Sequence, residues 1–304
     1  MKKTEVIANL SKRLLGLVSM GLALAGLAAP VTAKTMVRPA LWAVSDADTT
    51  IYLFGTIHLL PQDYQWRTQK FDRAVSSSQQ LIVETIVDEA KPQEMMGAMA
   101  SLAFSPNLPP IAERVPTAKR TQLDAAIKKS GLPRESFDRM ETWAAAFMLL
   151  GNQFRDMGLK SGAGVETTLR SAFTSQGKTI GQLETNKEQL SFFDGLPESA
   201  QRDLLLGAIE EPTGMSKDFN RMLSAWARGD VSAIAATFNR DLASSPALRD
   251  ALLKRRNANW TRWVNQRMAE PGSVMVAVGA GHLAGRDSVL DMLKQKGFTV
   301  RRVQ

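Results

Sequence analysis

The only two histidines of this 304-residue chain, His58 and His282, stand in the same local setting. Each one closes a Gly-x-x-His segment that follows a short apolar run, at residues 50–54 and 273–278. A neutral imidazole is a good ligand for Zn, Mn, Co or Fe, and two imidazoles with one carboxylate leave a coordination position open for water. A metal so held lowers the pKa of the bound water and polarises a carbonyl. The pattern therefore predicts a metal site for hydrolysis.

Three glutamates are candidates for the carboxylate of this site. Glu84 ends the apolar run that follows His58, and is the leading candidate for a ligand or for the base that activates water. Glu184 ends another short apolar run, and Glu166 follows a Gly-rich turn, so one of them could ligate the metal and another act as base. The alternative interpretation is ordinary: strand-end histidines that only form hydrogen bonds, and glutamates on the surface or at helix caps.

Arg256 and Asn257 lie in a long helical pattern, where residues of these types usually form a solvated face. Beside a metal site they would instead support the ligands, and the guanidinium of Arg256 would match the geometry of a substrate carboxylate. Other catalytic classes find little support. The chain has no cysteine, which excludes a catalytic thiol, and it has no G-x-S-x-G segment and no Walker A motif.

The elements that must position these residues alternate between strand and helix. Five apolar runs predict strands, at residues 50–54, 81–83, 179–183, 273–278 and 298–303. The order strand, G-x-x-H, loop, helix, strand occurs twice, at the two ends of the chain. We therefore predict a mixed α/β fold whose largely parallel central sheet comes from a duplicated β-loop-α-β unit. The histidines would then lie at the carboxyl edge of the sheet, where ligands bind in such folds.

The chain between the two units is mainly helical. Apolar residues recur at three- and four-residue steps over about residues 92–160 and 200–268, and prolines divide the first stretch into several helices. We interpret these stretches as a large helical region inserted into a single domain that spans residues 34–304.

Residues 1–33 show the pattern of a secretory signal peptide. A charged start leads into an apolar run at residues 14–29, and small residues ending at Ala33 form a cleavage site. An uncut membrane anchor is the alternative, but the run is shorter than the ~20 residues that a helical span needs. We therefore expect a bacterial periplasmic protein with no stable membrane span after cleavage near Ala33.

The formal net charge of +8 does not predict a nucleic-acid partner. Four basic residues and one acidic residue in the predicted signal peptide account for +3, which leaves +5 for the mature chain. The remaining basic residues alternate with acidic ones and form no stripe with interleaved aromatic residues.

Six segments of the chain together resemble the TraB/GumN family, which includes the TIKI proteases. They are LWAVSDADTTIYLFGTIHLLPQD near residues 41–63, LIVET at 81–85, GAGVETTL at 162–169, IGQLETNKEQLSFFDGLP at 180–197, RRNANW at 255–260 and VAVGAGHLAGRDSVLDMLKQKGF at 276–298. The resemblance implies the mixed α/β fold and an active site that contains His58, Glu84 and His282. Other positions also match family motifs, with roles less defined: Glu166, Glu184, Arg256 and Asn257.

The resemblance also implies an activity, that of a metal-dependent peptidase acting on a peptide or protein with a divalent Mn, Co or Zn ion. Two alternatives stay open. One is a non-catalytic periplasmic protein that sequesters a peptide or haem, with the histidines as axial ligands, because the wider superfamily is similar to haem-binding ChaN-like and erythromycin-esterase-like proteins. The other is an accessory role in envelope polysaccharide production, which the GumN name suggests. The sequence leaves the metal, the substrate and the oligomeric state undetermined.

Overall fold

A computed structural model of the chain describes residues 37–61, 63–87, 91–157, 159, 164–209, 212–242 and 245–304. The predicted signal peptide, residues 1–33 with its cleavage site near Ala33, lies outside the described residues, as do residues 161–163 of the Gly-rich turn. In the part of the chain that the structure describes, no helix combines the length and the apolar character that crossing a membrane requires.

Within the ranges that the structure describes, six strands form one sheet in the order β4-β3-β5-β2-β1-β6. Their bounds are β1 Leu41–Ser45, β2 Thr49–Thr56, β3 Gln80–Val83, β4 Thr179–Gln182, β5 Gly272–Gly279 and β6 Val300–Arg302. β4, β3, β5 and β2 pair in parallel, whereas β1 is antiparallel to both β2 and β6. The predicted mixed α/β fold with a largely parallel sheet is thus confirmed. The apolar-run pattern does not predict β1, because so short a run is not distinguishable from a buried helix or loop segment by periodicity.

The two units with the G-x-x-H pattern cross the sheet in opposite directions. From β2 the chain passes through α1 (Gln69–Ser77) to β3, with β5 lying between these two strands. From β5 it passes through α13 (Val289–Gln295) to β6, beyond β2 and β1. Right-handed connections in opposite directions require helices on opposite faces, and α1 and α13 indeed belong to the apolar cores of opposite faces. Their common origin by duplication stays a prediction.

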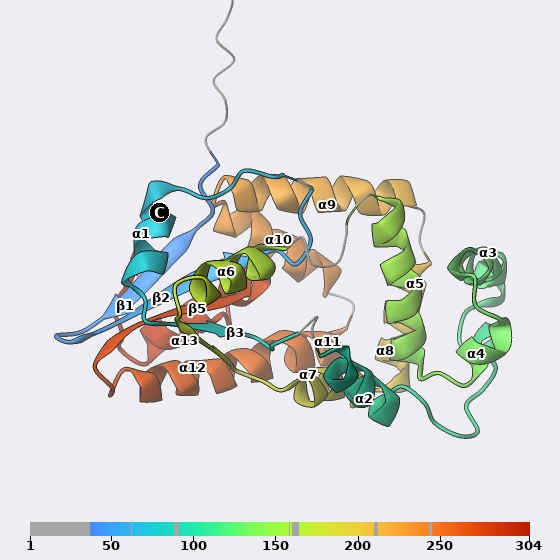
Figure 1. Ribbon diagram of the computed structural model, residues 1–304. Coiled ribbons are helices and arrows are strands. Elements are labelled where there is room, and N and C mark those ends of the chain that lie inside the picture. The colour runs from blue at the N-terminus through green and yellow to red at the C-terminus, as the bar shows by residue number, and fades with distance from the viewer. Residues whose placement is uncertain are drawn as a thin grey trace, which may run out of the picture. The chain divides into compact units, whose positions relative to one another are not determined.

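Further helices complete the two faces of the sheet. α6 (Val165–Thr174), α9 (Pro212–Ala227) and α10 (Val231–Asp241) contribute to the same core as α1. α12 (Arg255–Arg267) joins α13 on the opposite face, through Trp260 and Val264. Figure 1 shows α1 and α9 above the sheet and α12 below it. Short 3₁₀ turn η4 (Ala280–Leu283) follows β5 directly and carries His282.

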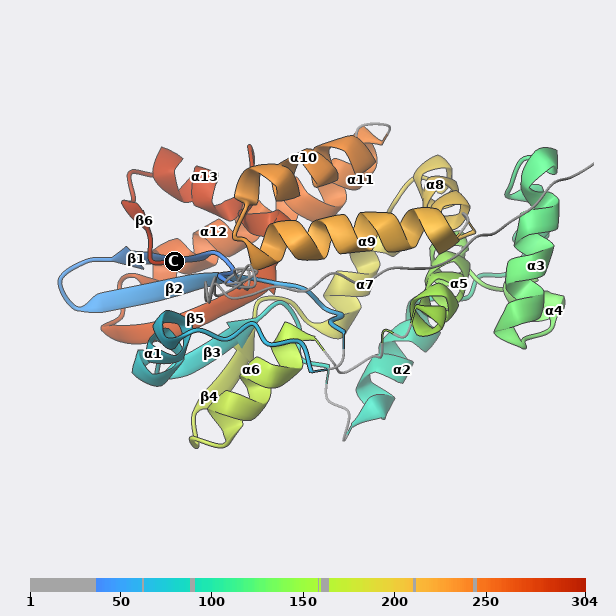
Figure 2. The ribbon, with the colours of Figure 1, turned by 90° about the horizontal axis from the view of Figure 1, so that it is seen from above.

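A third apolar core holds a group of helices together beyond one end of the strands (Figure 2). It draws on α2 (Pro92–Leu102), η1 (Ile111–Glu113), α3 (Arg120–Ser130), α4 (Arg134–Asp138), α5 (Thr142–Asp156), α7 (Asn186–Asp194) and α8 (Glu198–Ala208); η2 (Thr117–Lys119) leads into α3. Trp143 is fully buried at its centre. That this group is an insertion stays a prediction.

The long helical pattern that contains Arg256 and Asn257 is interrupted in the structure. α11 (Pro246–Arg249) is followed by η3 (Asp250–Lys254), which is a π-helical turn, and only then by α12. Leu248 and Ala251 pack in a small apolar cluster with Leu196 and Ala200. The wider turn shifts the residues that follow it around the helix axis relative to a regular α-helix, and such turns frequently occur at functional sites.

Candidate active site

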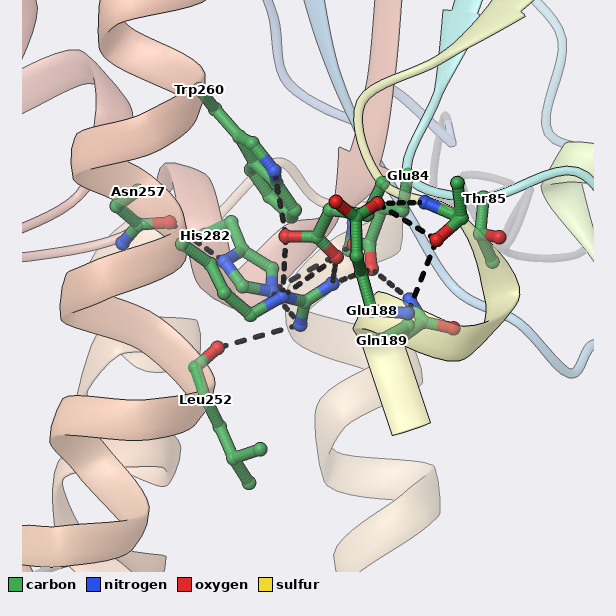
Figure 3. Close-up of polar contacts among 12 residues, drawn as sticks. Glu84, Thr85, Glu188, Gln189, Leu252, Asn257, Trp260 and His282 are labelled. Carbon is green, nitrogen blue, oxygen red and sulfur yellow. Dashed lines mark hydrogen bonds and ion pairs between the residues drawn. The ribbon is translucent and has the colours of Figure 1, made fainter. Parts of the chain in front are cut away.

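Four neighbouring parallel strands each end beside a predicted site residue. β4, β3, β5 and β2 are followed by Glu184, Glu84, His282 and His58 respectively. Because the carboxyl ends of parallel strands meet at one edge of a sheet, these side chains from distant parts of the chain come to the same edge. Figure 3 shows Glu84 and His282 there, with α12 supplying further polar groups.

Gly279 marks the point where three of these side chains face one another. The position that a Cβ of residue 279 would take lies 3.2 Å from Glu84 Oε1, 3.6 Å from His282 Cδ2 and 3.8 Å from His58 Nε2. Since glycine has no Cβ, the space between the carboxylate and the two imidazoles is left open. The structure therefore brings together the two histidines and the leading glutamate.

Glu84 is buried and ionised. Its Oε1 accepts the backbone N–H of Gly279 at 2.7 Å, and its Oε2 accepts from Arg256 Nη2 at 2.6 Å and from Gln189 Nε2 at 3.2 Å. Burial raises the pKa of Glu84, but the nearby His282, Arg256 and His58 and the Gly279 N–H outweigh it and lower this pKa to about 2. The carboxylate is therefore negative at neutral pH.

His282 is a neutral ring in one tautomer. Its Nδ1 lies 2.7 Å from Asn257 Oδ1, while Asn257 Nδ2 donates to the carbonyl of Asp287 at 2.8 Å. Because the amide nitrogen is committed to a carbonyl, the amide oxygen faces the ring and Nδ1 carries the proton. The lone pair of Nε2 accepts from Arg256 Nη1 at 3.2 Å. Burial, helped by the charge of Arg256 and opposed by Glu84, lowers the pKa of His282 to about 3.

Glu166 holds the ring of His58 through Nδ1, as Asn257 holds the ring of His282. His58 Nδ1 lies 2.7 Å from Glu166 Oε1, and the hydroxyl of Thr56 donates to the same oxygen. Glu166 is placed by the start of α6, where the Val165 N–H donates to the Ile57 carbonyl at 3.1 Å. Both histidines are thus fixed through Nδ1. Nε2 of His58 faces the open space, whereas Nε2 of His282 accepts from Arg256.

The charge of Glu166 also changes the titration of His58. Loss of hydration lowers the pKa of His58, but the hydrogen bond and charge of Glu166 and the charge of Glu84 outweigh it and raise this pKa above its ordinary value. The side chain of His58 is 69% exposed, so water screens part of this effect. The ring is accessible to solvent, in contrast to the buried His282.

Arg256 lies buried between two glutamates and His282. Its Nε donates to Glu184 Oε1 at 3.0 Å, and its Nη2 donates to Glu184 Oε2 at 2.8 Å and to Glu84 Oε2 at 2.6 Å. Its Nη1 donates to His282 Nε2 at 3.2 Å and to the Leu252 carbonyl at 3.4 Å. All five N–H groups therefore have protein acceptors, and the predicted role of holding a substrate carboxylate would require one of these bonds to break.

Glu184 positions the guanidinium of Arg256. Both of its oxygens accept from Arg256, and Oε1 also accepts from Trp260 Nε1 at 2.9 Å. The guanidinium lies over the Trp260 ring, 4.7 Å from its centroid. The neighbouring Arg255 instead pairs with Asp250 at 3.0 Å, and its side chain is exposed.

The residues present fit a divalent cation in type and in charge. Two imidazole Nε2 atoms and a carboxylate suit Mn, Co or Zn. Three carboxylates (Glu84, Glu166 and Glu184) and one guanidinium (Arg256) give the site a formal charge of −2 with neutral imidazoles. Among the described residues no three His, Asp or Glu side chains are arranged to bind a metal directly. In this arrangement the guanidinium of Arg256 contacts Glu84 Oε2 and His282 Nε2.

Thr56, Gln189 and Trp260 complete the site and were not predicted from the sequence. Thr56 carried a signal, because it lies inside the first G-x-x-H segment. Gln189 and Trp260 lie on helices whose inward faces depend on packing, and nothing in their local spacing distinguishes them from core or surface residues.

Fold and site together define a mixed α/β protein with a His/His/Glu cluster at the carboxyl edge of its parallel strands. Residues 40–302 match the TraB/PrgY/gumN family, and the chain belongs to that family. The family predicted from the sequence is thereby confirmed.

Two similar proteins carry the name "Uncharacterized protein YbaP". The one from Escherichia coli K12 is 24% identical over 256 residues, which cover 84% of this chain and 92% of that protein. The one from Shigella flexneri is 24% identical over 243 residues, which cover 80% of this chain and 87% of that protein. No solved structure matches the chain.

Proposed function

We propose that this protein is an exported, periplasmic metal-dependent hydrolase that cleaves peptide bonds, with His58, His282 and Glu84 as the residues that hold a divalent Mn, Co or Zn ion. The observation that carries the proposal is the open space beside Gly279, which faces Glu84 Oε1, the ring of His282 and Nε2 of His58. The peptide substrate follows from the resemblance to the TIKI proteases.

The residues around the space have separable tasks. When bound, the ion would supply a Lewis acid that polarises the scissile carbonyl and lowers the pKa of water. Glu166 and Asn257 hold the two imidazoles through Nδ1, so the Nε2 lone pair of each ring is the one that could bind the ion. Glu84 is ionised and faces the same space, so it acts there as a ligand or as the base that takes a proton from water.

Metal content tests the proposal most directly. The purified mature chain, prepared with an affinity tag that contains no histidine, should hold close to one equivalent of a divalent ion. His58→Ala and His282→Ala should each lose it. Glu94→Gln is a matched control, because Glu94 is an exposed carboxylate on α2 outside the site. Wild-type metal content in both histidine variants would remove the metal site from the proposal.

Hydrolysis is tested separately from metal binding. A library of short peptides should be cleaved by the chain with added Mn, Co or Zn, and a chelator should stop the cleavage. If cleavage persists in chelator but fails in His58→Ala, the hydrolase stands without the metal, with the His58–Glu166 pair as base. Sequestration of a peptide or haem, and a role in polysaccharide production, stay predictions for which these contacts supply no specific support.

A further inference from the structure

Arg256 contacts two residues that the proposed metal site also needs. Its Nη2 donates to Glu84 Oε2 at 2.6 Å, and its Nη1 donates to His282 Nε2 at 3.2 Å. The tautomer of His282, fixed by Asn257, leaves Nε2 with a single lone pair. That lone pair is the one with which the ring would bind a metal, so it serves either the guanidinium or the ion.

We propose that Arg256 is a built-in cation that competes with the divalent ion for Glu84 and His282 and so sets the metal affinity of the site. The inference rests on the proposed metal-dependent function and adds a residue that controls it. In the metal-free protein the guanidinium supplies a cation to the buried carboxylate of Glu84 and a donor to the buried Nε2 of His282.

The surroundings of Arg256 allow it to yield these two atoms without becoming unpaired. Its Nε and Nη2 bonds to Glu184, at 3.0 and 2.8 Å, do not involve the proposed ligands. Its guanidinium also lies 4.7 Å from the Trp260 ring centroid and 5.5 Å from that of Phe192. Giving up Glu84 and His282 therefore leaves the buried charge with a carboxylate and two aromatic faces.

The charge of the site supports competition between the two cations. With Arg256 the formal charge is −2, and with a neutral side chain in its place the charge becomes −3. Charges a few ångströms apart in a buried site interact strongly, because little water screens them. Removing the guanidinium should therefore strengthen the attraction of Glu84 for a divalent ion and free the lone pair of His282 Nε2 at the same time.

Calorimetric titration with MnCl₂ or ZnCl₂ tests the inference. Arg256→Gln should lower the Kd of the metal at least tenfold relative to the wild type. Arg255→Gln is the matched control: it removes the same charge from the adjacent residue of α12, whose side chain is exposed and pairs with Asp250, and its Kd should not change. Equal or weaker binding in Arg256→Gln, with the wild type binding normally, would overturn the inference and leave the proposed function intact.

A double variant separates competition from a simple change in charge. In Arg256→Gln/Glu184→Gln the two removed charges cancel and the site keeps its formal charge of −2 with neutral imidazoles. Of the two carboxylates that Arg256 contacts, only Glu84 then remains, without its guanidinium partner. The double variant also tests the inference if Arg256→Gln alone does not fold. Tighter metal binding than the wild type supports competition for the ligand atoms, and wild-type or weaker affinity overturns it. If neither the wild type nor the variants bind metal, this inference and the metal site fall together.

A second readout needs no metal. Because the chain has only two histidines, ring ¹⁵N spectra of histidine-labelled protein contain two spin systems, which His58→Ala assigns. In the metal-free protein the Nε2 resonance of His282 should shift on Arg256→Gln, since it loses the donor at 3.2 Å. An unchanged Nε2 resonance would show that the guanidinium does not hold this atom, and would overturn the inference.

Discussion

Substitution of Gly279 by alanine should separate metal binding from folding. The backbone of Gly279 has φ −49° and ψ 136°, which alanine adopts without strain. The added methyl group would lie 3.2 Å from Glu84 Oε1, 3.6 Å from His282 Cδ2 and 3.8 Å from His58 Nε2. It would therefore occupy the space that the three side chains face, while the rest of the fold stays unchanged.

The expected effects on stability and on binding differ in size. Glycine to alanine at a compatible backbone position stabilises a protein by about 0.4–1 kcal/mol through the unfolded chain. Against this stands one tight contact with Glu84 Oε1, which the Gly279 N–H and Arg256 hold in place, and crowding of this kind costs about 1–3 kcal/mol. The net loss of unfolding free energy should be on the order of 1 kcal/mol. Metal affinity should fall at least a hundredfold, about 2.7 kcal/mol.

Urea unfolding and calorimetric metal titration measure the two quantities on the same sample. Gly151→Ala in α5 is the control, because nothing lies within 4 Å of the Cβ position there. It should gain up to about 1 kcal/mol of stability from helix propensity and keep the wild-type Kd. A folded Gly279→Ala protein that binds metal as tightly as the wild type would refute the assignment of this space to the ion.

Three further results are expected. Asn257→Ala removes the acceptor of His282 Nδ1–H at 2.7 Å, so it should cost about 1–3 kcal/mol of unfolding free energy and weaken metal binding about 10- to 100-fold; wild-type stability and affinity would contradict the role of Asn257. Burial lowers the pKa of His282 to about 3, below its ordinary 6.5. As the pH falls, this ring therefore binds a proton in the unfolded chain before it does so in the folded protein. The stability of the metal-free protein should decrease as pH falls from about 6.5 towards 3. This ring contributes up to about 1.4 kcal/mol per pH unit, and unfolding curves of His282→Gln should show a shallower slope; an equal slope would count against the buried neutral ring. Glu166 raises the pKa of His58, so metal binding should release a proton from this ring at neutral pH, measurable by calorimetry in two buffers of different ionisation enthalpy. Glu166→Gln should release fewer protons on metal binding than the wild type. An identical number of released protons would argue against the pairing of His58 with Glu166.

Much of the fold was predictable because its signals are local. The strands β2, β3, β4 and β5 coincide closely with apolar runs, and the helices α1 and α13 with three- and four-residue spacing. Less was predictable where tertiary contacts decide. β1 pairs with the next strand, β2, but also with β6 from the far end of the chain, and the π-helical turn η3 divides a helical pattern whose periodicity runs on without a break. A local pattern records the period of an element, not its partners.

The chemistry of the site divides in the same way. The residue types of the site and their positions after strands are recognisable from the sequence. They are the two G-x-x-H segments, and Glu84 and Glu184 each at the end of an apolar run. The roles of Arg256 and Asn257 cannot be read from the sequence, because they depend on which face of α12 meets the sheet. The packing of that helix placed one guanidinium on two carboxylates and one amide on His282 Nδ1.

The sequence by itself therefore determined the family, the mixed α/β class and the residues that meet at one edge of the sheet. Only the tertiary structure decided the strand order, in which β5 lies between β2 and β3 and brings His282 beside Glu84 and within reach of His58. Only the structure, too, showed that an arginine already contacts both Glu84 and His282. The physical reason is that strand periodicity and turn residues act over a few positions, whereas strand order and side-chain pairing depend on contacts between distant residues. These lie from 25 positions apart, for Asn257 and His282, to 260 positions apart, for Trp42 and Arg302, and no local pattern encodes them.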